Sequence, residues 1–99
     1  MTNYNKVLNL LGIARRAGKI ISGEGIVLNA IKNRKVNYLF IASDCGASTK
    51  KKFLDKSKFY EVPVNTGMLK DDLSEAIGMK RSIVAIEDKG FSKKFKELK

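Results

Sequence analysis

The run Val36–Ala42, which reads VNYLFIA, constrains the fold more than any other segment because it is apolar at nearly every position. A strand with one face in solvent alternates apolar and polar residues, whereas a strand covered on both faces is apolar along its length. We therefore expect Val36–Ala42 to be a central strand of a sheet whose two faces are both covered.

Segments with helical and strand-like periodicity alternate along the rest of the chain. Apolar residues recur on one helical stripe between Tyr4 and Ala17, and Gly18 supplies a stop signal. Strands that alternate with helices predict an α/β fold of three layers, α on β on α, in a single domain over residues 1–99. The other expected elements are strands at 19–22, 60–64 and 82–87, and helices at 24–33, around 50–54, between Thr66 and Ile77, and around 91–98.

Two local signals refine this pattern in the second half of the chain. Thr66 is expected to cap the helix that Gly78 ends. Pro63 lacks a backbone donor, so it places the strand at 60–64 at an edge of the sheet or near the end of a strand.

Positive charge is concentrated in the first three-fifths of the chain. The 20 Lys and Arg residues outnumber the 10 Asp and Glu residues, for a formal net charge of +10. Residues 1–58 hold 12 basic and 3 acidic side chains, whereas residues 59–99 hold 8 basic and 7 acidic ones. This asymmetry favours a surface for an anionic partner over a uniformly solvated lysine coat. Because most of the basic residues are lysines, we expect backbone attraction that weakens steeply with salt.

The residue types that catalysis and metal binding need are scarce. The chain has no histidine, which excludes His-based acid–base catalysis and His metal ligands. Its one cysteine, Cys45, has no partner for a disulfide or a CxxC pair and favours a reducing, cytoplasmic environment. The adjacent pair Asp71 and Asp72 points in directions about 100° apart on a helix, so it does not converge on one ion. We expect no enzyme, no metal and no cofactor, and no membrane span.

The turn SGEG at residues 22–25 falls at a strand-to-helix junction. Backbone N–H groups at a helix amino-terminus favour an anion, and Lys19 and Lys32 flank the turn in the sequence. The spacing is not that of a P-loop or of a dinucleotide-binding turn. From these residues alone, a tight turn that only starts a helix remains as plausible as an anion site. Few aromatic residues are free for base stacking, which favours recognition of a shaped RNA.

Four longer segments have an order and spacing that the periodicity alone does not explain. They are RAGKIISGEG before a helix, LFIASD at the end of a strand, VPV before a helix, and LSEAIGMKRSIVAIED. Together they resemble the ribosomal protein L7Ae/L30e family over essentially the whole chain. The resemblance implies a three-layer α/β/α sandwich with a four-stranded mixed sheet, no catalysis, and binding to kink-turn RNA.

The resemblance also implies which residues meet the RNA. In the family, the amino-terminus of the helix after the first strand enters the kinked groove, and a second loop packs on a flipped-out base. Lys19, Gly23 and Asp44 match family positions, and residues 79–81 occupy the second loop. The implied RNA-binding set is Lys19, Gly23, Glu24, Gly25, Ile26, Asn29, Lys32, Asp44, Met79, Lys80 and Arg81.

The chain departs from the family pattern at three of these positions. Gly25, Ile26 and Asn29 stand where typical members carry Asn or Lys, Glu or Gln, and Lys. Each lost base contact costs about 1–3 kcal/mol, so we expect weaker or less selective kink-turn binding than that of the ribosomal members. Helix backbone N–H groups, Glu24 and Asn29 are expected to substitute, and another ribosomal RNA element is an open alternative.

Two other function classes stay open at this point. The same fold serves as a protein-binding adaptor, in which case the basic face would meet an acidic protein. An enzyme would require a cofactor-binding domain for which 99 residues leave no room, so only an accessory role is compatible. The favoured expectation is a monomeric, cytoplasmic, ribosome-associated RNA-binding protein.

Overall fold

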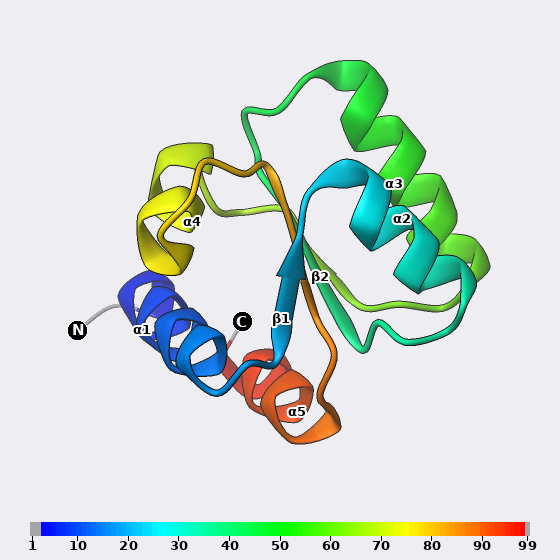
Figure 1. Cartoon of the computed structure of the whole chain (residues 1–99). Helices are drawn as coiled ribbons and strands as arrows, with labels where there is room; N and C mark the ends of the chain where they lie inside the picture. Colours follow the sequence, from blue (N-terminus) through cyan, green and yellow to red (C-terminus); the bar gives the residue numbers. More distant parts are fainter. Residues whose placement is uncertain (1–2, 99) are drawn as a thin grey trace.

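A computed structural model describes residues 3–98 of the chain (Figure 1). Helices and strands alternate as the periodicity predicts. The helices are α1 (Asn3–Arg16), α2 (Glu24–Lys32), α3 (Ala47–Phe59), α4 (Lys70–Ile77) and α5 (Lys89–Leu98). The strands are β1 (Ile20–Ser22), β2 (Tyr38–Ile41), β3 (Val64–Asn65) and β4 (Ile83–Ile86).

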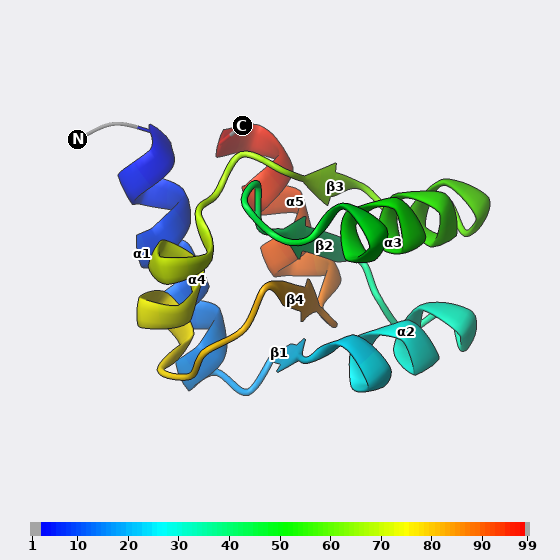
Figure 2. The same ribbon diagram turned by 90° about the horizontal axis from the view of Figure 1, so that it is seen from above.

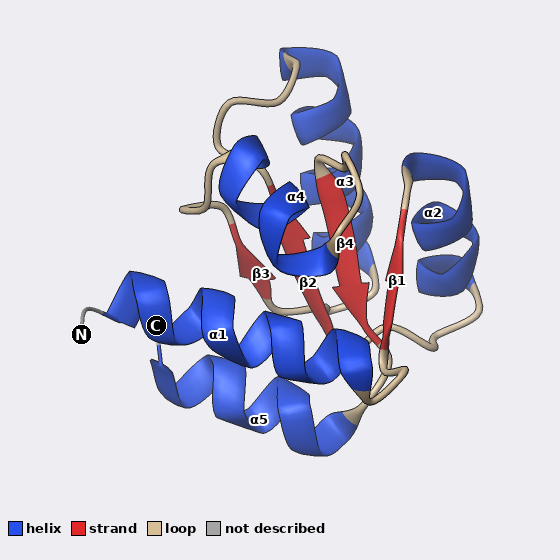
Figure 3. Ribbon diagram, turned by 60° about the vertical axis from the view of Figure 1, so that its left-hand side comes forward, coloured by secondary structure: helices blue, strands red, loops and turns tan. Residues whose placement is uncertain are grey.

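The four strands form one mixed sheet in the order β1-β4-β2-β3. Strand β4 is antiparallel to both of its neighbours, whereas β2 and β3 are parallel. It follows that β1, β2 and β3 all run in the same direction. Each of these three strands is followed by a helix. Helices α2, α3 and α4 therefore all begin at the same end of the sheet, where these parallel strands finish (Figures 1 and 3).

Helices cover both faces of the sheet, which confirms the three-layer α/β/α sandwich (Figure 2). Alternate residues of the central strands enter different cores, because successive side chains of a strand point to opposite faces. Tyr38 and Phe40 pack with α1, α4 and α5, whereas Leu39 and Ile41 pack with α2 and α3. All four are buried, as an apolar strand covered on both faces must be. The same alternation holds in β4, where Val84 and Ile86 face one core and Ile83 and Ala85 the other.

Aromatic rings fill the core under α5. The ring of Phe95 stacks on Tyr38 with centroids 5.6 Å apart and meets Phe40 edge-on at 5.1 Å. Fully burying an aromatic side chain of this size stabilises a fold by about 1.5–3 kcal/mol. This cluster fixes α5 against β2 and β4, and with it the position of the amino-terminal end of α5.

The strand expected at 60–64 is the largest departure from the sequence prediction. In the structure, only Val64–Asn65 form a strand in this region, β3. This strand lies at an edge of the sheet, as the position of Pro63 predicts. Helix α3 runs on to Phe59, and residues 60–62 complete its carboxyl end. There the N–H of Val62 donates to the carbonyl of Ser57 at 2.7 Å, and Glu61 has a left-handed φ of 58°. Residues 60–62 first provide hydrogen-bond donors for the free carbonyl groups at the end of α3. The chain therefore becomes extended later than its β-branched residues predict.

The expected Thr66 cap is also wrong, because α4 begins later, at Lys70. Two side chains from distant parts of the chain replace it. Asp44 accepts the N–H of Lys70 at 2.9 Å, and the Tyr4 hydroxyl accepts the N–H of Leu69 at 3.1 Å. A helix start is stable only when its free N–H groups find acceptors, and here tertiary contacts supply them. The predicted end of the helix is confirmed, since Gly78 is left-handed with φ 77°.

Within residues 3–98, none of the helices is both long enough and apolar enough to cross a lipid bilayer.

Candidate nucleic-acid interface

The end of the sheet at which α2, α3 and α4 begin gathers backbone donors and the basic residues Lys50, Lys70, Lys80 and Arg81, together with the acidic residues Glu24, Asp71 and Asp72. We call it the helix-start edge, and define it as the first turns of these three helices together with loop 78–82. The first N–H groups of each helix have no acceptor within the helix, and the dipoles place partial positive charge at the same ends. Three helix starts at one edge therefore form a surface that favours an anion before any side chain is considered.

Gly23 sets the geometry at the start of α2. Its φ of 97° and ψ of 143° lie in a region that is essentially restricted to glycine. In this conformation its N–H donates to the carbonyl of Ile83 at 3.1 Å, while its own carbonyl accepts the N–H of Val27 at 3.0 Å. No side chain caps the helix. The N–H groups of Glu24 and Gly25 therefore have no side-chain cap as a competing acceptor.

A hollow of about 200 Å³ opens beside Gly23. Arg81 lies over Gly23, with its Nε 3.6 Å from the place that a Cβ on Gly23 would occupy. One terminal nitrogen of the guanidinium donates to the carbonyl of Lys80 at 2.9 Å, and the backbone N–H of Arg81 donates to the Ser74 hydroxyl at 3.1 Å. The Nε is buried without a hydrogen-bond partner among the described residues. The hollow is lined by Gly23, Glu24, Lys70, Lys80, Arg81, Ser82 and Ile83.

Side-chain contacts join the three helix starts to one another. Lys52 of α3 forms an ion pair with Glu24 of α2, with Nζ and Oε1 3.4 Å apart. Asp44, in the loop before α3, accepts the N–H of Lys70 at the start of α4. Asp44 thus has a structural role that explains an acidic residue at a basic edge. Its carboxylate holds α4 in place beside α2.

The structure brings together most of the residues that the sequence singles out. Met79 is half-exposed, and its sulfur lies 3.6 Å from the hydroxyl of Ser22, next to Gly23. Gly25 has open space around it, and Ile26 is 64% exposed, so the first turn of α2 has free access to a partner. Asn29 is also exposed and follows one turn later on the side of Ile26.

Lys19 and Lys32 do not join this group. Lys19 precedes β1, and its carbonyl accepts the N–H of Glu87, which follows the last residue of β4. The start of β4, not its end, lies next to Gly23. Lys32 is the last residue of α2, so it lies a helix length away from Gly23, or roughly 13 Å. Both sit at the opposite edge of the sheet, which we call the lysine edge. It carries Lys19, Lys32, Lys35, Lys89, Lys93 and Lys96.

Two functional candidates at the helix-start edge were missed by the sequence reasoning. Lys70 lines the hollow, and Lys52 pairs with Glu24. Lys70 is the first residue of α4, where the dipole disfavours a cation, and that mismatch is a signal in the sequence that singles it out. Lys52 lies in the second turn of α3, and only the fold brings it to Glu24.

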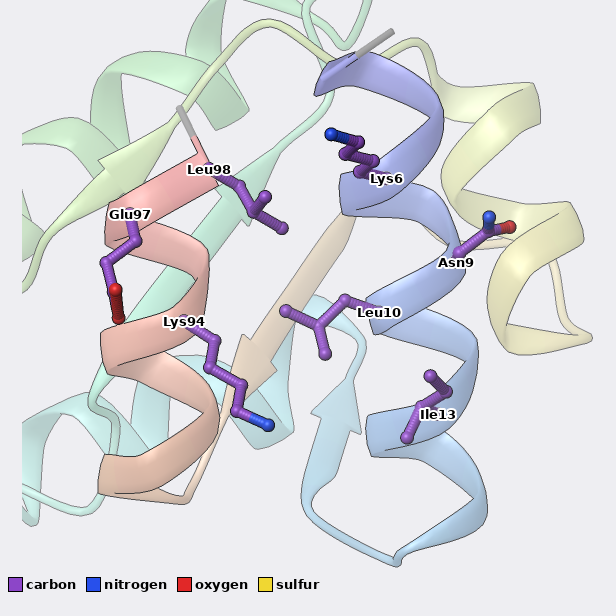
Figure 4. Close-up of a pocket in the computed structure, with 7 residues that line it drawn as sticks. All are labelled: Lys6, Asn9, Leu10, Ile13, Lys94, Glu97 and Leu98. Atoms are coloured by element: carbon purple, nitrogen blue, oxygen red, sulfur yellow. The ribbon is translucent and has the colours of Figure 1, made fainter. Parts of the chain in front are cut away.

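A second hollow lies apart from the one at Gly23. A hollow of about 370 Å³ between α1 and α5 has an apolar floor of Leu10, Ile13 and Leu98, flanked by Lys6 and Lys94 (Figure 4). It shares no lining residue with the hollow at Gly23. Among residues 3–98, Cys, Asp and Glu side chains nowhere gather in a group of three or more that would hold a metal ion.

Comparison with known proteins identifies relatives over nearly the whole chain. The family model described as the ribosomal protein L7Ae/L30e/S12e/Gadd45 family matches residues 5–96. The chain is 44% identical over 96 residues to RNA-binding protein YlxQ of Enterococcus faecium, covering 97% of this chain and 93% of that protein. It is 37% identical over 86 residues to RNA-binding protein YlxQ of Bacillus subtilis, covering 86% of each.

Solved structures share the same fold. A protein of unknown function from Bacillus halodurans superposes with a TM-score of 0.90 at 40% identity, covering 94% of this chain and 95% of that one. The Giardia lamblia 15.5kD RNA binding protein superposes with a TM-score of 0.82 at 18% identity, covering 98% of this chain and 90% of that one. With its sequence matched from residue 5 to residue 96 and its α/β sandwich shared, the chain belongs to the ribosomal protein L7Ae/L30e/S12e/Gadd45 family.

Proposed function

We propose that the protein is a non-catalytic RNA-binding protein that holds a kink-turn or a similarly bent RNA against the helix-start edge. The observation that carries the proposal is the convergence of three helix amino-termini on one edge, around a hollow lined by Lys70, Lys80 and Arg81. Helix starts bind phosphate through backbone N–H groups, and cations nearby neutralise the same groups. The relatives named as RNA-binding proteins support the same assignment.

The residues at this edge divide by their chemistry. Lys70 and Lys80 are suited to phosphate oxygens, because a lysine ammonium acts as a point charge. Arg81 presents a planar fork that is suited to a base edge or to two phosphate oxygens. The N–H groups of the exposed residues Glu24 and Gly25, and the side chain of Asn29, can read base edges. The half-exposed thioether of Met79 offers an apolar surface for an unstacked base.

The departures at Gly25 and Ile26 supply a test of this site. Because Ile26 is 64% exposed and Gly25 has open space around it, both positions accept polar side chains without disturbing the core. The double substitution Gly25→Asn and Ile26→Glu restores side chains of the type that typical members use. We expect it to strengthen kink-turn binding by about 1–3 kcal/mol per restored base contact. Unchanged affinity in a folded double variant would contradict the placement of the RNA on α2.

The main experiment is a fluorescence titration of the whole chain. The probes are a kink-turn RNA and a mutant of the same length that cannot kink, each at two salt concentrations. We expect tighter binding to the kinked RNA, and a loss of affinity with salt for both RNAs because neutralised phosphates release counterions. Equal and feeble binding to the two RNAs would refute recognition of the bent shape.

The cellular setting extends the proposal. We propose that the chain acts as one RNA-binding domain, as a monomer in the cytoplasm, and that its RNA is part of the ribosome. The half-buried free thiol of Cys45 and the family's ribosomal members support this setting. Sedimentation of a cell extract through a sucrose gradient, with and without ribonuclease, tests it. Recovery only at the top of the gradient without nuclease would argue against a ribosomal partner.

A further inference from the structure

A second concentration of positive charge lies at the lysine edge, away from the proposed RNA site. Three lysines of α5 converge there on a hollow of about 420 Å³. Lys89, Lys93 and Lys96 follow one another at helical spacing, so their side chains leave the same face of α5. The hydroxyl of Ser92 donates to the carbonyl of Asn37 at 2.7 Å and fixes this face against the start of β2. The hollow is lined by Asn37, Lys89, Ser92, Lys93 and Lys96.

Within residues 3–98, no acidic side chain forms an ion pair with any of the three lysines. The residues that line the hollow are all basic or uncharged. The ion pairs formed between described residues are Lys51 with Asp55 and Lys52 with Glu24, and neither involves α5. The nearby carboxylate of Asp88 accepts the N–H of Phe91 at 2.8 Å. Three like charges on one helix face repel each other at a cost to the folded state.

The position of Lys89 at the start of α5 raises that cost, whereas Lys96 lies in the last turn, where the dipole favours a cation. Lys89 is the first residue of the helix, and the first turn of α5 contains no acidic residue. Partial positive charge from the dipole accumulates there, so a cation is unfavourable at this end. By contrast, Lys32 ends α2 and is stabilised by the opposite end of a helix dipole. The folded chain by itself gains nothing from Lys89 at this position, whereas a bound anion would offset the repulsion among the three lysines.

The chemistry of the hollow favours a phosphate backbone over a protein partner. Protein interfaces are enriched in aromatic residues, Met and Arg at their centres and are depleted in Lys. Here the lining consists of lysines with one amide and one hydroxyl. From Lys89 to Lys96 the helix axis advances about 10 Å. One strand of a duplex presents about three phosphates over that length.

We infer that the Lys89, Lys93 and Lys96 face of α5 is a second binding site, for the sugar-phosphate backbone of an RNA stem that extends beyond the kinked segment. The inference rests on the proposed function, since it assigns a second contact to the same RNA. From Asn37 to Ala42 the chain runs along β2 from one edge of the sheet to the other, roughly 16 Å. An RNA that is bent around the molecule would therefore contact both edges at once. Lys19 and Lys32, which lie at this second edge, would contribute to the same attraction.

The chain offers a matched pair of double variants for the test. Lys93→Ala with Lys96→Ala removes two charges from the proposed second site. Lys6→Ala with Lys94→Ala removes two charges that flank the α1–α5 hollow (Figure 4). That hollow shares no lining residue with the one at Lys89, Lys93 and Lys96. Both pairs change the net charge equally, and Lys93, Lys94 and Lys96 share one helix. Circular dichroism melting curves establish that each variant is folded.

The measurement is the affinity of each variant for a kink-turn RNA with long stems and for the same RNA with trimmed stems, over a range of salt. We expect the Lys93/Lys96 variant to bind the long-stem RNA about three- to tenfold more weakly at low salt, with a salt slope lower by roughly 1.5–2. We expect the Lys6/Lys94 variant to change affinity less than about twofold, because its charges face away from the RNA. On the trimmed RNA both variants should match the wild type.

The outcomes separate the two hypotheses. Equal losses in both variants mean that only overall charge matters, and they overturn the second site. No loss in either variant also overturns it, as would be expected if this face met an acidic protein. Wild-type binding that does not distinguish kinked from unkinked RNA refutes the proposed function. The comparison of the two variants on the long-stem RNA still reports on α5 in that case.

Discussion

Both the helix-start edge and the lysine edge carry basic side chains, but they hold these charges in different ways. At the helix-start edge the cations are placed by contacts: Arg81 lies against Gly23, and Lys52 pairs with Glu24. At the lysine edge Lys93 and Lys96 line an open hollow, and neither takes part in an ion pair with a described residue. The first edge also presents the starts of α2, α3 and α4, whereas at the second edge α2 ends and α5 begins.

This difference indicates different contributions to binding. Backbone donors in a fixed geometry distinguish one shape of partner from another, because a misplaced acceptor leaves a donor unpaired. Flexible lysines attract any phosphate and add affinity that depends on salt. We therefore expect the helix-start edge to supply selectivity for a bent RNA and the lysine edge to supply additional, unselective affinity.

The largest expected effect concerns the backbone geometry of the helix-start edge. Gly23→Ala forces a Cβ onto a residue with φ 97°, so we expect the free energy of unfolding to fall by about 1–3 kcal/mol. Gly25→Ala is the matched control, because Gly25 lies inside α2 with open space around it. It should raise stability by about 0.5–1 kcal/mol, since alanine loses less backbone entropy in a helix. Urea denaturation measures both, and equal effects would contradict a special backbone conformation at Gly23.

The next prediction compares the selectivity of the two edges. Lys80→Ala with Arg81→Ala removes the cations beside Gly23, and we expect kink-turn affinity to fall about tenfold, or about 1.4 kcal/mol. The ratio of affinities for kinked and unkinked RNA should fall as well. Lys93→Ala with Lys96→Ala removes the same charge from the other edge and should leave this ratio unchanged when both RNAs have trimmed stems, because only a long stem reaches α5. If the α5 variant lowers the ratio instead, the division between selectivity and affinity is wrong.

Asp44 and Asp88 each accept an N–H at a helix start, one at each edge, and replacing them should have a smaller effect on stability than Gly23→Ala. Asp44 accepts the N–H of Lys70 at the start of α4, and Asp88 accepts the N–H of Phe91 in the first turn of α5. Replacing either by Ala should lower the free energy of unfolding by about 1 kcal/mol, because a helix-start donor loses its acceptor. Thermal melting tests this prediction, and an unchanged melting temperature would contradict a capping role.

A charge-only change at Asp44 separates capping from electrostatics. Asp44→Asn keeps an oxygen that can accept the N–H of Lys70 but removes a negative charge from the proposed RNA edge. We expect it to preserve most of the stability that Asp44→Ala loses and to tighten RNA binding slightly. Weaker RNA binding by Asp44→Asn would indicate that the carboxylate itself contacts the RNA.

The smallest expected effect is the pH dependence that Tyr4 contributes. Burial and the hydrogen bond that its hydroxyl donates to Asp72 raise the pKa of Tyr4 above the ordinary tyrosine value, although the bond it accepts from Leu69 opposes this. Because this pKa is raised in the folded state, the folded chain keeps the proton of Tyr4 up to a higher pH than the unfolded chain does. The stabilisation is therefore complete below about pH 10 and is lost as the pH rises above that value.

The Tyr4→Phe variant isolates this contribution, since lysines also titrate at high pH. We expect it to be less stable than the wild type near neutral pH, because the N–H of Leu69 loses its acceptor. Above about pH 10 the difference between the two proteins should shrink. A difference that is constant with pH would show that the hydroxyl of Tyr4 does not retain its proton preferentially in the folded state.

Much of the fold was predictable because its signals are local. The apolar run Val36–Ala42 indicates a strand covered on both faces, and Tyr38 to Ile41 are indeed buried in alternate cores. Gly18 and Gly78 end their helices in the left-handed conformation that glycine favours. The Thr66 cap was wrong because the acceptors for the start of α4 come from Asp44 and Tyr4, which are remote in the sequence.

The candidate site was predictable only in part. Gly23 and residues 79–81 were expected to lie at one site, and the structure places them around or beside the same hollow. The flanking lysines Lys19 and Lys32 are near Gly23 in the sequence but lie at the other edge, because β1 and α2 each carry the chain away from it. Proximity in the sequence therefore misplaced them, and whether they bind RNA stays a prediction.

The amino-acid sequence by itself determined the elements and the charge: apolar periodicity specifies helices and strands, glycines end helices, and lysines supply the positive field. Only the tertiary structure decided which helix starts meet. That depends on the strand order β1-β4-β2-β3, with β1, β2 and β3 pointing the same way. Strand order is set by the packing of residues that are distant in the chain, whereas periodicity is set by neighbours. For this reason the helix-start edge and the lysine edge, and the different contributions to RNA binding proposed for them, can be recognised only in the folded molecule.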